Sequence, residues 1–365
     1  MGFSSADYPD NEWFACCRRL CDVSDSENQL PVTDINSINS INDERSEVLW
    51  QQAARWLWKQ RRHAPSDADI RDLRFHRESR QDELFRRVVQ GDYRLKPMLC
   101  YRTQKNERVM QWAADDALVL KWLALQADGR LPVHERCEHR KHGGGARASV
   151  RRLHHAIQNE AGYRFVYRTD IRGYYRHIRK PQAYAMFCRC LPEPVLQDLF
   201  RQYLYYSVED GGEIHSPENG SPRGCSLSPQ VGASLLYHCD DDSGHQEEIY
   251  YARYMDDFMV LTKTRWHLRR SIRRLNDYLD TGGFSVHPDK TYIGRLRHGF
   301  DWLGVSFDET GSTGLSERAI KQHRERCLRL YEQACRRGLT DSVAREHVQA
   351  YRTRWKRWGR SMLAG

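Results

Sequence analysis

The chain has no apolar run close to the roughly 20 residues that a transmembrane helix needs, and its N-terminus lacks the pattern of a secretory signal peptide. Its eleven cysteines are scattered, without the paired C-x2-C spacing of structural zinc sites. The groups that come nearest are Cys137 with His139 and His142, and Cys188 with Cys190. We therefore expect a cytoplasmic protein with reduced thiols, no membrane span and no structural zinc.

A basic, glycine-rich segment at residues 140–145 lacks the Lys-Ser/Thr pair of a nucleotide-binding P-loop. It precedes a predicted helix that carries Arg147, Arg151 and Arg152. Backbone N–H groups at such a loop and helix start can bind phosphate. Two interpretations stay open for this segment: contact with the phosphate backbone of a nucleic acid, or a simple linker.

Positive charge is in excess, with 58 Lys and Arg against 49 Asp and Glu, a net charge of +9 over 365 residues. From Glu317 onward the chain has 13 Lys and Arg against 5 Asp and Glu, interleaved with Tyr351, Trp355 and Trp358. Basic side chains neutralise phosphates, and aromatic rings pack on bases or on a neighbouring core. The clustering favours a nucleic-acid partner over an ordinary solvated helical face.

Two adjacent carboxylates, Asp256 and Asp257, stand between the strand-like stretches 250–254 and 258–261, which are rich in aromatic and β-branched residues. This pattern predicts a β-hairpin with the acids at its tip. Two acids so placed repel each other, and oxygen ligands suit a hard cation such as Mg²⁺. An isolated Asp-Asp pair is more often an ordinary turn, so the interpretation depends on the rest of the chain.

A third carboxylate, Asp170, ends another strand-like run at residues 165–170. A carboxylate at a strand end beside a carboxylate hairpin can clamp two divalent ions, the arrangement used for in-line phosphoryl transfer.

At this point the chain resembles the reverse transcriptase family. Residues 254–257 (Tyr-Met-Asp-Asp) resemble its YxDD catalytic motif, and Asp170 followed five residues later by Tyr175 resembles its first catalytic motif. The segment 224–229 (Gly-Cys-Ser-Leu-Ser-Pro) resembles the GxxxSP segment that lies between them. The three motifs occur in the family's order and spacing.

The resemblance continues after the hairpin. Residues 287–291 (His-Pro-Asp-Lys-Thr) resemble the lysine-bearing motif, and residues 299–304 (Gly-Phe-Asp-Trp-Leu-Gly) resemble the primer grip. The resemblance covers about residues 50 to 365. The sequences of its motifs are closer to those of bacterial, group II intron-like enzymes than to those of retroviral ones.

The fold implied by this resemblance is an α+β right-hand polymerase with fingers, a palm built on an antiparallel sheet, and a helical thumb. We expect a poorly ordered N-terminal extension over residues 1–45 and a helical lead-in with fingers over 46–161. The palm and its catalytic core then occupy 162–306, and a basic helical thumb occupies 307–365.

Local patterns support helices and hairpins at definite places. Residues 93–110 alternate as in a hairpin, 115–126 form a strong helix pattern, and glycines at 211 and 282–283 mark a turn and a helix end. Apolar residues at helical spacing between Glu47 and Gly91 indicate further helices; they are Leu49, Ala53, Trp56, Leu57, Leu73, Phe75, Leu84 and Val88.

By resemblance, Asp170, Asp256 and Asp257 bind two Mg²⁺ ions, for which Mn²⁺ can substitute. Asp170 and Asp256 bridge both ions, Asp257 has a supporting role, and Ile171 offers only its backbone carbonyl. The bound ions would acidify the primer 3′-hydroxyl and neutralise the leaving pyrophosphate.

By resemblance, Tyr175 stands where the family has its steric gate against the ribose 2′-hydroxyl. The competing interpretation of Tyr175 is core packing, since Tyr174 beside it would face the opposite side and one of the two must pack inward. Arg223 departs from the Gln that usually precedes Gly224 at the incoming nucleotide, so the role of that Gln cannot be transferred.

In the family, Lys and Arg residues of the fingers grip the incoming triphosphate, and by resemblance Arg102 and Arg108 have this role. For Lys105, a basic surface turn is an equally good explanation. Lys290 is a candidate proton donor to pyrophosphate or an ordinary exposed lysine. Ser228-Pro229 is interpreted as structural.

The expected function is RNA-directed DNA polymerase activity, with an RNA template, dNTPs and a DNA product. Because the chain leaves no room for an RNase H or endonuclease domain after the thumb, a dedicated noncoding RNA in a bacterial antiviral defence or domesticated retroelement system is the preferred context. The alternatives are template-independent or protein-primed DNA synthesis on the same fold, and a nonenzymatic, maturase-like RNA-binding protein. No oligomeric state is predicted.

Overall fold

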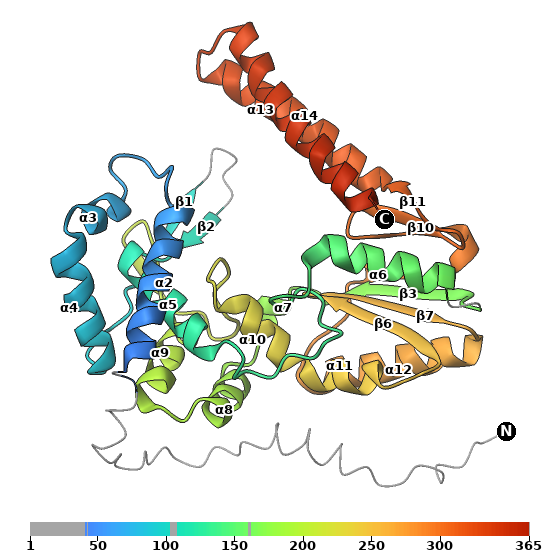
Figure 1. Cartoon of the computed structure of the whole chain (residues 1–365), viewed down its shortest axis with the longest axis horizontal. Coiled ribbons are helices and arrows are strands. Elements are labelled where there is room, and N and C mark those ends of the chain that lie inside the picture. The colour runs from blue at the N-terminus through green and yellow to red at the C-terminus, as the bar shows by residue number, and fades with distance from the viewer. Residues whose placement is uncertain (1–40, 42, 103–107, 160–161, 365) are drawn as a thin grey trace. The chain divides into compact units, whose positions relative to one another are not determined.

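The computed structural model describes residues 41, 43–102, 108–159 and 162–364, a mixture of helices and strands (Figure 1). These residues form two compact units that are each discontinuous in sequence. The first unit takes the chain up to Pro132 and then Gly173–Leu235, and the second takes Val133–Arg172 and Leu236–Gly365. All but a few residues of the expected N-terminal extension lie outside the described part of the chain.

The first unit is mainly helical. Its helices are α2 (Glu44–Gln60), α3 (Asp69–Phe75), α4 (Arg77–Val89), α5 (Ala114–Ala127), α7 (Tyr174–His177), α8 (Lys180–Cys190), α9 (Pro194–Leu204) and α10 (Ser228–Leu235). The carboxylate of Asp43 caps α2 by accepting from the Ser46 N–H at 2.7 Å. Helix α2 packs on α5, where the indole of the buried Trp122 donates to the Ser46 carbonyl at 3.1 Å.

The helices expected from apolar spacing before Gly91 and over 115–126 are therefore confirmed. Phe75 is an exception among the residues assigned to that spacing, because its side chain is 85% exposed. It is the last residue of the short helix α3, where the apolar face ends.

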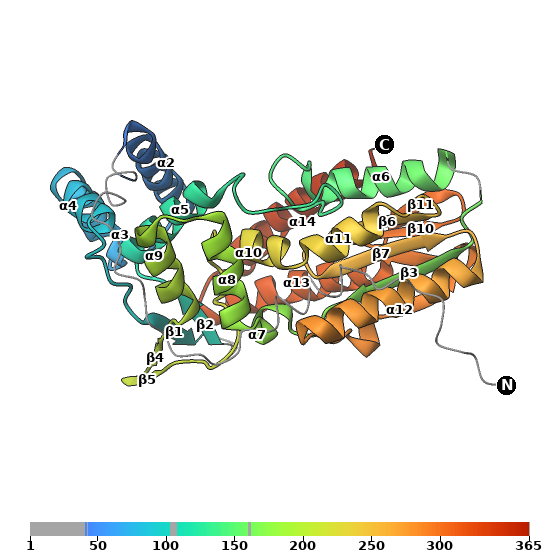
Figure 2. The same cartoon turned by 90° about the horizontal axis from the view of Figure 1, so that it is seen from below.

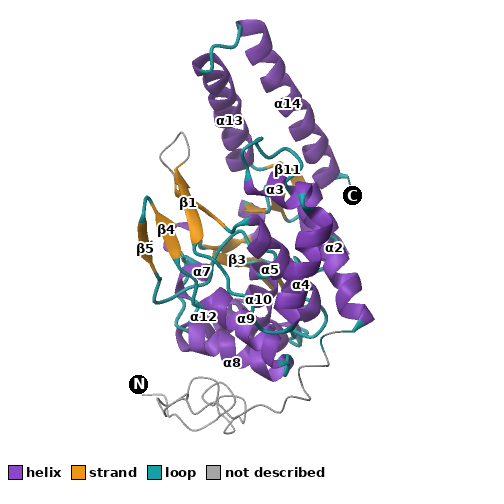
Figure 3. Cartoon of the chain, turned by 90° about the vertical axis from the view of Figure 1, so that its left-hand side faces the viewer, coloured by secondary structure: helices purple, strands orange, loops and turns teal. Residues whose placement is uncertain are grey.

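A four-stranded sheet in the first unit has the order β2-β1-β4-β5 (Figure 3). Its strands are β1 (Met98–Arg102), β2 (Arg108–Gln111), β4 (Val208–Asp210) and β5 (Glu213–His215). The hairpin expected over residues 93–110 is confirmed as the antiparallel pair β1–β2, whose connection, with Lys105, lies outside the described residues. The turn at Gly211-Gly212 joins β4 and β5, and both glycines have positive φ, at 66° and 94°.

The second unit is built on an antiparallel sheet of order β6-β7-β3-β8. Its strands are β3 (Phe165–Asp170), β6 (Ile249–Tyr254), β7 (Asp257–Thr262) and β8 (Tyr292–Arg295). Helix α6 (Gly145–Asn159) lies on one side of this sheet, and α11 (Tyr237–Gly244) with α12 (Arg265–Gly282) lies on the other (Figure 1). Figure 2 views the sheet from the side of α11 and α12. The strand ending at Asp170 and the hairpin with the acids are therefore confirmed.

A core forms under α6, where apolar side chains of the sheet meet those of a second sheet of order β11-β10-β9. That sheet consists of β9 (Phe300–Trp302), β10 (Val305–Asp308) and β11 (Gly311–Leu315). The buried indole of Trp302 donates to the Ser149 hydroxyl at 2.9 Å, which ties the second sheet to α6. Strands β10 and β11 were not anticipated from the sequence.

Residues Leu303 and Gly304 make the two-residue turn between β9 and β10, with φ of 48° and 87°. A two-residue hairpin turn of this kind needs positive φ, which explains the glycine. The chain then forms the helix hairpin α13 (Glu317–Arg336) and α14 (Asp341–Leu363), with the hydroxyl of Ser316 capping α13. Among the described residues, no helix is both long and apolar enough to cross a membrane.

Candidate active site

Three carboxylates gather at one end of the β7–β3 pair. Asp170 is the last residue of β3 and pairs in register with Asp257, the first residue of β7, while Asp256 lies in the turn before it. One oxygen from each of the three lies within 4.8 Å of the others. Asp170 is buried, and Asp256 and Asp257 are half-buried. Strand register therefore brings together Asp170 and Asp257, which are 87 positions apart in sequence.

The turn that carries Asp256 is a tight one. Tyr254 pairs with Asp257, so Met255 and Asp256 are its two central residues, and Met255 adopts a left-handed φ of 57°. Primed two-residue turns require positive φ at the first central position, which is unfavourable for a residue with a side chain. The Asp256 carbonyl accepts from the Ile171 N–H at 3.0 Å, which fixes the turn to the residue after Asp170.

Electrostatics at this cluster favour a bound cation. Burial, followed by the charges of Asp170 and Asp256, raises the pKa of Asp257 to about 6. A group of carboxylates that resists ionisation in this way is stabilised by a divalent ion, and oxygen-only donors suit Mg²⁺ or Mn²⁺. The donor set and spacing therefore fit divalent metal ions of this kind.

One cation of the protein already contacts the cluster. Lys290, in the short helix Pro288–Lys290, places its Nζ 2.8 Å from Oδ2 of Asp170 and is 42% exposed. The segment is held there because the His287 N–H donates to the Asp170 carbonyl at 2.7 Å and Thr291 bonds Thr169 at 2.7 Å through their hydroxyls. The sequence predicted a role for Lys290 but gave no sign of this ion pair.

Other charged residues near the turn were missed from the sequence. Arg253, on β6, and Asp240, on α11, form a pair in which both side chains are 0% exposed. The signal was present, because an arginine within an apolar strand requires a buried partner. His139, considered earlier only with a zinc group, accepts the Met255 N–H at 2.9 Å through Nδ1.

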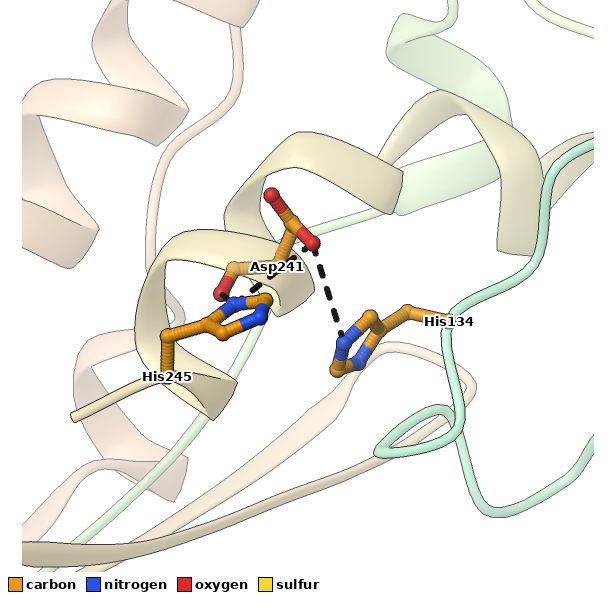
Figure 4. A group of neighbouring side chains, drawn as sticks. All are labelled: His134, Asp241 and His245. Atoms are coloured by element: carbon orange, nitrogen blue, oxygen red, sulfur yellow. Dashed lines mark hydrogen bonds and ion pairs between the residues drawn. The ribbon is translucent and has the colours of Figure 1, made fainter. Parts of the chain in front are cut away.

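A second group of side chains has spacing compatible with a metal ion: His134, Asp241 and His245 (Figure 4). Nδ1 of His134 accepts from the Arg136 N–H at 3.2 Å, so the neutral ring carries its proton on Nε2, the atom that faces Asp241. Nδ1 of His245 lies 2.6 Å from the Asp241 carbonyl, a distance that requires a proton on that nitrogen. In both histidines the ring nitrogen near Asp241 is thus the protonated one, which has no lone pair to offer a metal ion. We therefore interpret this group as a hydrogen-bonded and ionic contact rather than a metal site.

The remaining predicted site residues belong to the first unit. Tyr174 is the buried tyrosine, with its hydroxyl donating to the Gly232 carbonyl at 2.7 Å, and Tyr175 is half-buried. A Cβ at Gly232 would come within 3.1 Å of the Tyr174 ring and of the Tyr175 hydroxyl, a tight contact, so the glycine favours the close approach of α10. The Arg223 guanidinium lies 5.9 Å from the Tyr175 ring, a cation–π arrangement.

Gly224 is exposed, has a φ of 78°, and borders a cavity of about 250 Å³ in the first unit. The cavity wall includes Trp112 and Ser226, whose buried side-chain polar atoms have no hydrogen-bond partner among the described residues. The glycine therefore leaves backbone open to an approaching group.

Arg102 and Arg108 face each other across the β1–β2 pair, and both are exposed. Arg108 is 2.9 Å from an Asp210 oxygen. In the second unit, Arg152 of α6 bonds Glu138 at 2.6 Å and the Gly143 carbonyl at 3.2 Å. That contact folds the glycine-rich segment back on itself.

Aromatic residues of the C-terminal hairpin pack partly on one another. The His323 ring of α13 stacks on Trp355 of α14 at 3.9 Å and 16°, and on Tyr351 at 5.3 Å. These rings therefore join the two helices.

Comparison with protein families gives one match. The model of the reverse transcriptase (RNA-dependent DNA polymerase) family matches residues 108–307, more than half of the chain. The chain therefore belongs to the reverse transcriptase family and is an RNA-directed DNA polymerase, a nucleotidyltransferase. A search of curated proteins gave no match.

Proposed function

We propose that this reverse transcriptase extends a DNA primer on an RNA template by two-metal nucleotidyl transfer at Asp170, Asp256 and Asp257. The observation that carries the proposal is the single cluster formed by the three carboxylates, together with the raised pKa of Asp257. When bound, two Mg²⁺ ions supply acidification of the primer 3′-hydroxyl and neutralisation of charge on the leaving pyrophosphate.

Within this proposal the protein's own groups have separate tasks. Asp170 and Asp256 would hold the ions, Asp257 would support them, and the Ile171 carbonyl would be a further oxygen ligand. Lys290 Nζ, now paired with Asp170, is the proton donor to the leaving pyrophosphate.

Residues of the first unit select and hold the nucleotide. Tyr175, the less buried of the two tyrosines, excludes a 2′-hydroxyl, and Arg223 with Gly224 lies beside the incoming sugar and phosphates. Arg102 and Arg108, exposed on the β1–β2 hairpin, grip the triphosphate. The Arg108 contact with Asp210 would open when the nucleotide binds.

The domain roles follow the right-hand scheme. Residues 46–161 supply the lead-in and fingers, 162–306 the palm, and 307–365 the thumb, whose basic helices α13 and α14 hold the nucleic-acid duplex. The wording of the motifs supports a bacterial enzyme, and we place it in the cytoplasm, copying a dedicated noncoding RNA in an antiviral defence or domesticated retroelement system.

The deciding experiment is sequencing of the nucleic acid that co-purifies with the wild type and with Asp256→Asn. One dominant RNA in both samples, with matching cDNA only in the wild type, would support templated synthesis on a dedicated RNA. Normal cDNA from the variant would refute the catalytic assignment. DNA attached covalently to the protein would indicate protein priming, and RNA binding without any Mg²⁺-dependent incorporation would indicate a maturase-like binder.

A further inference from the structure

The buried pair of Arg253 and Asp240 makes direct contact with the turn that holds the acids. Arg253 Nε donates to Oδ1 of Asp240 at 2.7 Å and its Nη2 donates to Oδ2. The remaining nitrogen, Nη1, donates to the Met255 carbonyl at 2.8 Å. The guanidinium therefore links α11 to the residue that precedes Asp256.

A second segment of the chain holds the other side of Met255. His139 Nδ1 accepts the Met255 N–H at 2.9 Å. The stretch before it pairs with β6, since the Arg253 N–H donates to the Arg136 carbonyl at 2.9 Å and the Glu138 N–H donates to the Arg253 carbonyl at 2.8 Å. Both peptide groups that flank Met255 are thus bonded to side chains outside the turn.

These bonds meet at the one strained residue of the hairpin. Met255 has a φ of 57°, a conformation that a residue with a side chain leaves unless its surroundings hold it. Relaxation of Met255 would rotate the next residue, Asp256, relative to Asp170 and Asp257. A guanidinium is suited to prevent this because its donors lie in a rigid plane, so fixing two of them on Asp240 aims the third.

We propose that Arg253, aimed by Asp240, and His139 are positioning residues that hold Asp256 in register with Asp170 and Asp257. The inference rests on the proposed function, because it concerns the same three carboxylates. Neither residue touches the reacting atoms; both act through the Met255 backbone.

The competing explanation is that Arg253 and Asp240 only stabilise the fold. Arg253→Met would leave Asp240 buried without a counter-charge and could unfold the unit, so it cannot separate the two explanations. Arg253→Lys keeps the charge but cannot bond Asp240 twice and Met255 at once. His139→Leu removes the acceptor of the Met255 N–H, and His139→Gln retains a side-chain acceptor.

A matched control comes from a second ion pair whose acid is also on α11. Arg274, on α12, pairs with Asp242 of α11 and makes none of the described contacts with the turn. Arg274→Lys therefore makes the same Arg-to-Lys change in an ion pair whose acidic partner, Asp242, lies two residues after Asp240 on α11.

The test measures four quantities for each variant: the thermal midpoint, amide hydrogen exchange over residues 249–262, Mn²⁺ binding by calorimetry, and single-nucleotide incorporation on a primed RNA. For Arg253→Lys and His139→Leu we expect faster exchange of the turn, weaker Mn²⁺ binding and a maximal rate at least about tenfold lower, with the KM for primer–template unchanged. His139→Gln should recover most of the rate, and Arg274→Lys should match the wild type.

Rates within about twofold of the wild type for both variants, with unchanged exchange at the turn, would overturn the positioning role. Losses that simply follow the thermal midpoint, in Arg274→Lys as well, would also overturn it. A wild type without Mg²⁺-dependent incorporation would instead refute the proposed function. In that event, hydrogen exchange and Mn²⁺ binding still decide whether these residues hold the turn.

Discussion

The carboxylate turn of the second unit and the first-unit residues that we propose to select the nucleotide are held in place in different ways. The turn is fixed by strand register and by the buried side chain of Arg253, so Asp256 and Asp257 have little freedom. Tyr175 is half-buried on the short helix α7, and Arg102 is exposed on a hairpin. In the proposed function, the groups that hold metal ions at fixed distances thus sit in a bonded framework, whereas the groups that meet a variable substrate are open to solvent.

The largest effect on the rate of incorporation should come from substituting one of the three clustered carboxylates. Asp170→Asn keeps the shape of the side chain but removes a charge from the cluster, so we expect incorporation to fall at least about 1,000-fold. Single-nucleotide incorporation with Mg²⁺ measures this rate, and RNA binding serves as the control for folding. Activity within tenfold of the wild type would contradict the role of Asp170 as a ligand.

Lys290 combines features of both groups of residues, because its side chain is partly exposed and is also paired with Asp170. Lys290→Met removes both the ion pair and the proposed proton donor, and we expect a rate loss of roughly 100-fold. Pre-steady-state kinetics with dNTPs at saturation measures the loss. Lys290→Arg retains the charge but transfers a proton poorly; full activity in that variant would argue for an ion pair without proton transfer.

Substituting the solvent-accessible residues of the first unit should change the selectivity for dNTP over rNTP rather than the rate of dNTP incorporation. Tyr175→Ala removes the ring beside the proposed sugar position, so we expect discrimination against ribonucleotides to fall about tenfold or more while dNTP incorporation continues. The ratio of kcat/KM for dNTP and rNTP measures this. Tyr175→Phe keeps the ring and should keep the selectivity; unchanged selectivity in the alanine variant would remove the gate role.

The smallest effect on catalysis should come from a buried acid of the first unit. Burial raises the pKa of Asp116 to about 6 from a usual value of 3.8, although Tyr93 donates to its carboxylate at 2.8 Å. Because the folded state favours the protonated acid, this group's contribution to stability is present below about pH 4 and is lost as the pH rises to about 6.

Asp116→Asn cannot ionise, so its free energy of unfolding relative to the wild type should rise between pH 4 and 6, by up to about 3 kcal/mol. Denaturant unfolding at pH 4.5, 6 and 8 measures this difference. A difference that does not change with pH would show that Asp116 ionises normally in the folded protein.

Much of the site could be predicted because its signals are local in sequence. The run ending at Asp170, the apolar stretches around Asp256 and Asp257, and the helix pattern over 115–126 each depend on near neighbours, and all three took the expected form. The resemblance puts Tyr175 at the gate position, and because adjacent residues point to different sides, one of Tyr174 and Tyr175 is expected to pack inward; the structure shows Tyr174 as the buried one.

The rest depends on contacts between distant residues. The sequence around Arg253 does not indicate that Asp240 and His139 lie nearby in the fold. Strands β10 and β11 have too few apolar positions to be predicted from their sequence pattern. Phe75 fits a helical period yet is exposed, because the short helix α3 ends at that residue. The division into two discontinuous units likewise has no marker in composition.

That discontinuity governs the order in which the protein can fold as it leaves the ribosome. Strand β3 is made early, but its partners β7 and β8 end only at Thr262 and Arg295. Strand β3 must therefore wait without a partner strand while about 90 further residues, up to the end of β7, are synthesised. The three carboxylates cannot come together before translation has passed the hairpin, so a truncated chain is expected to carry no assembled metal site.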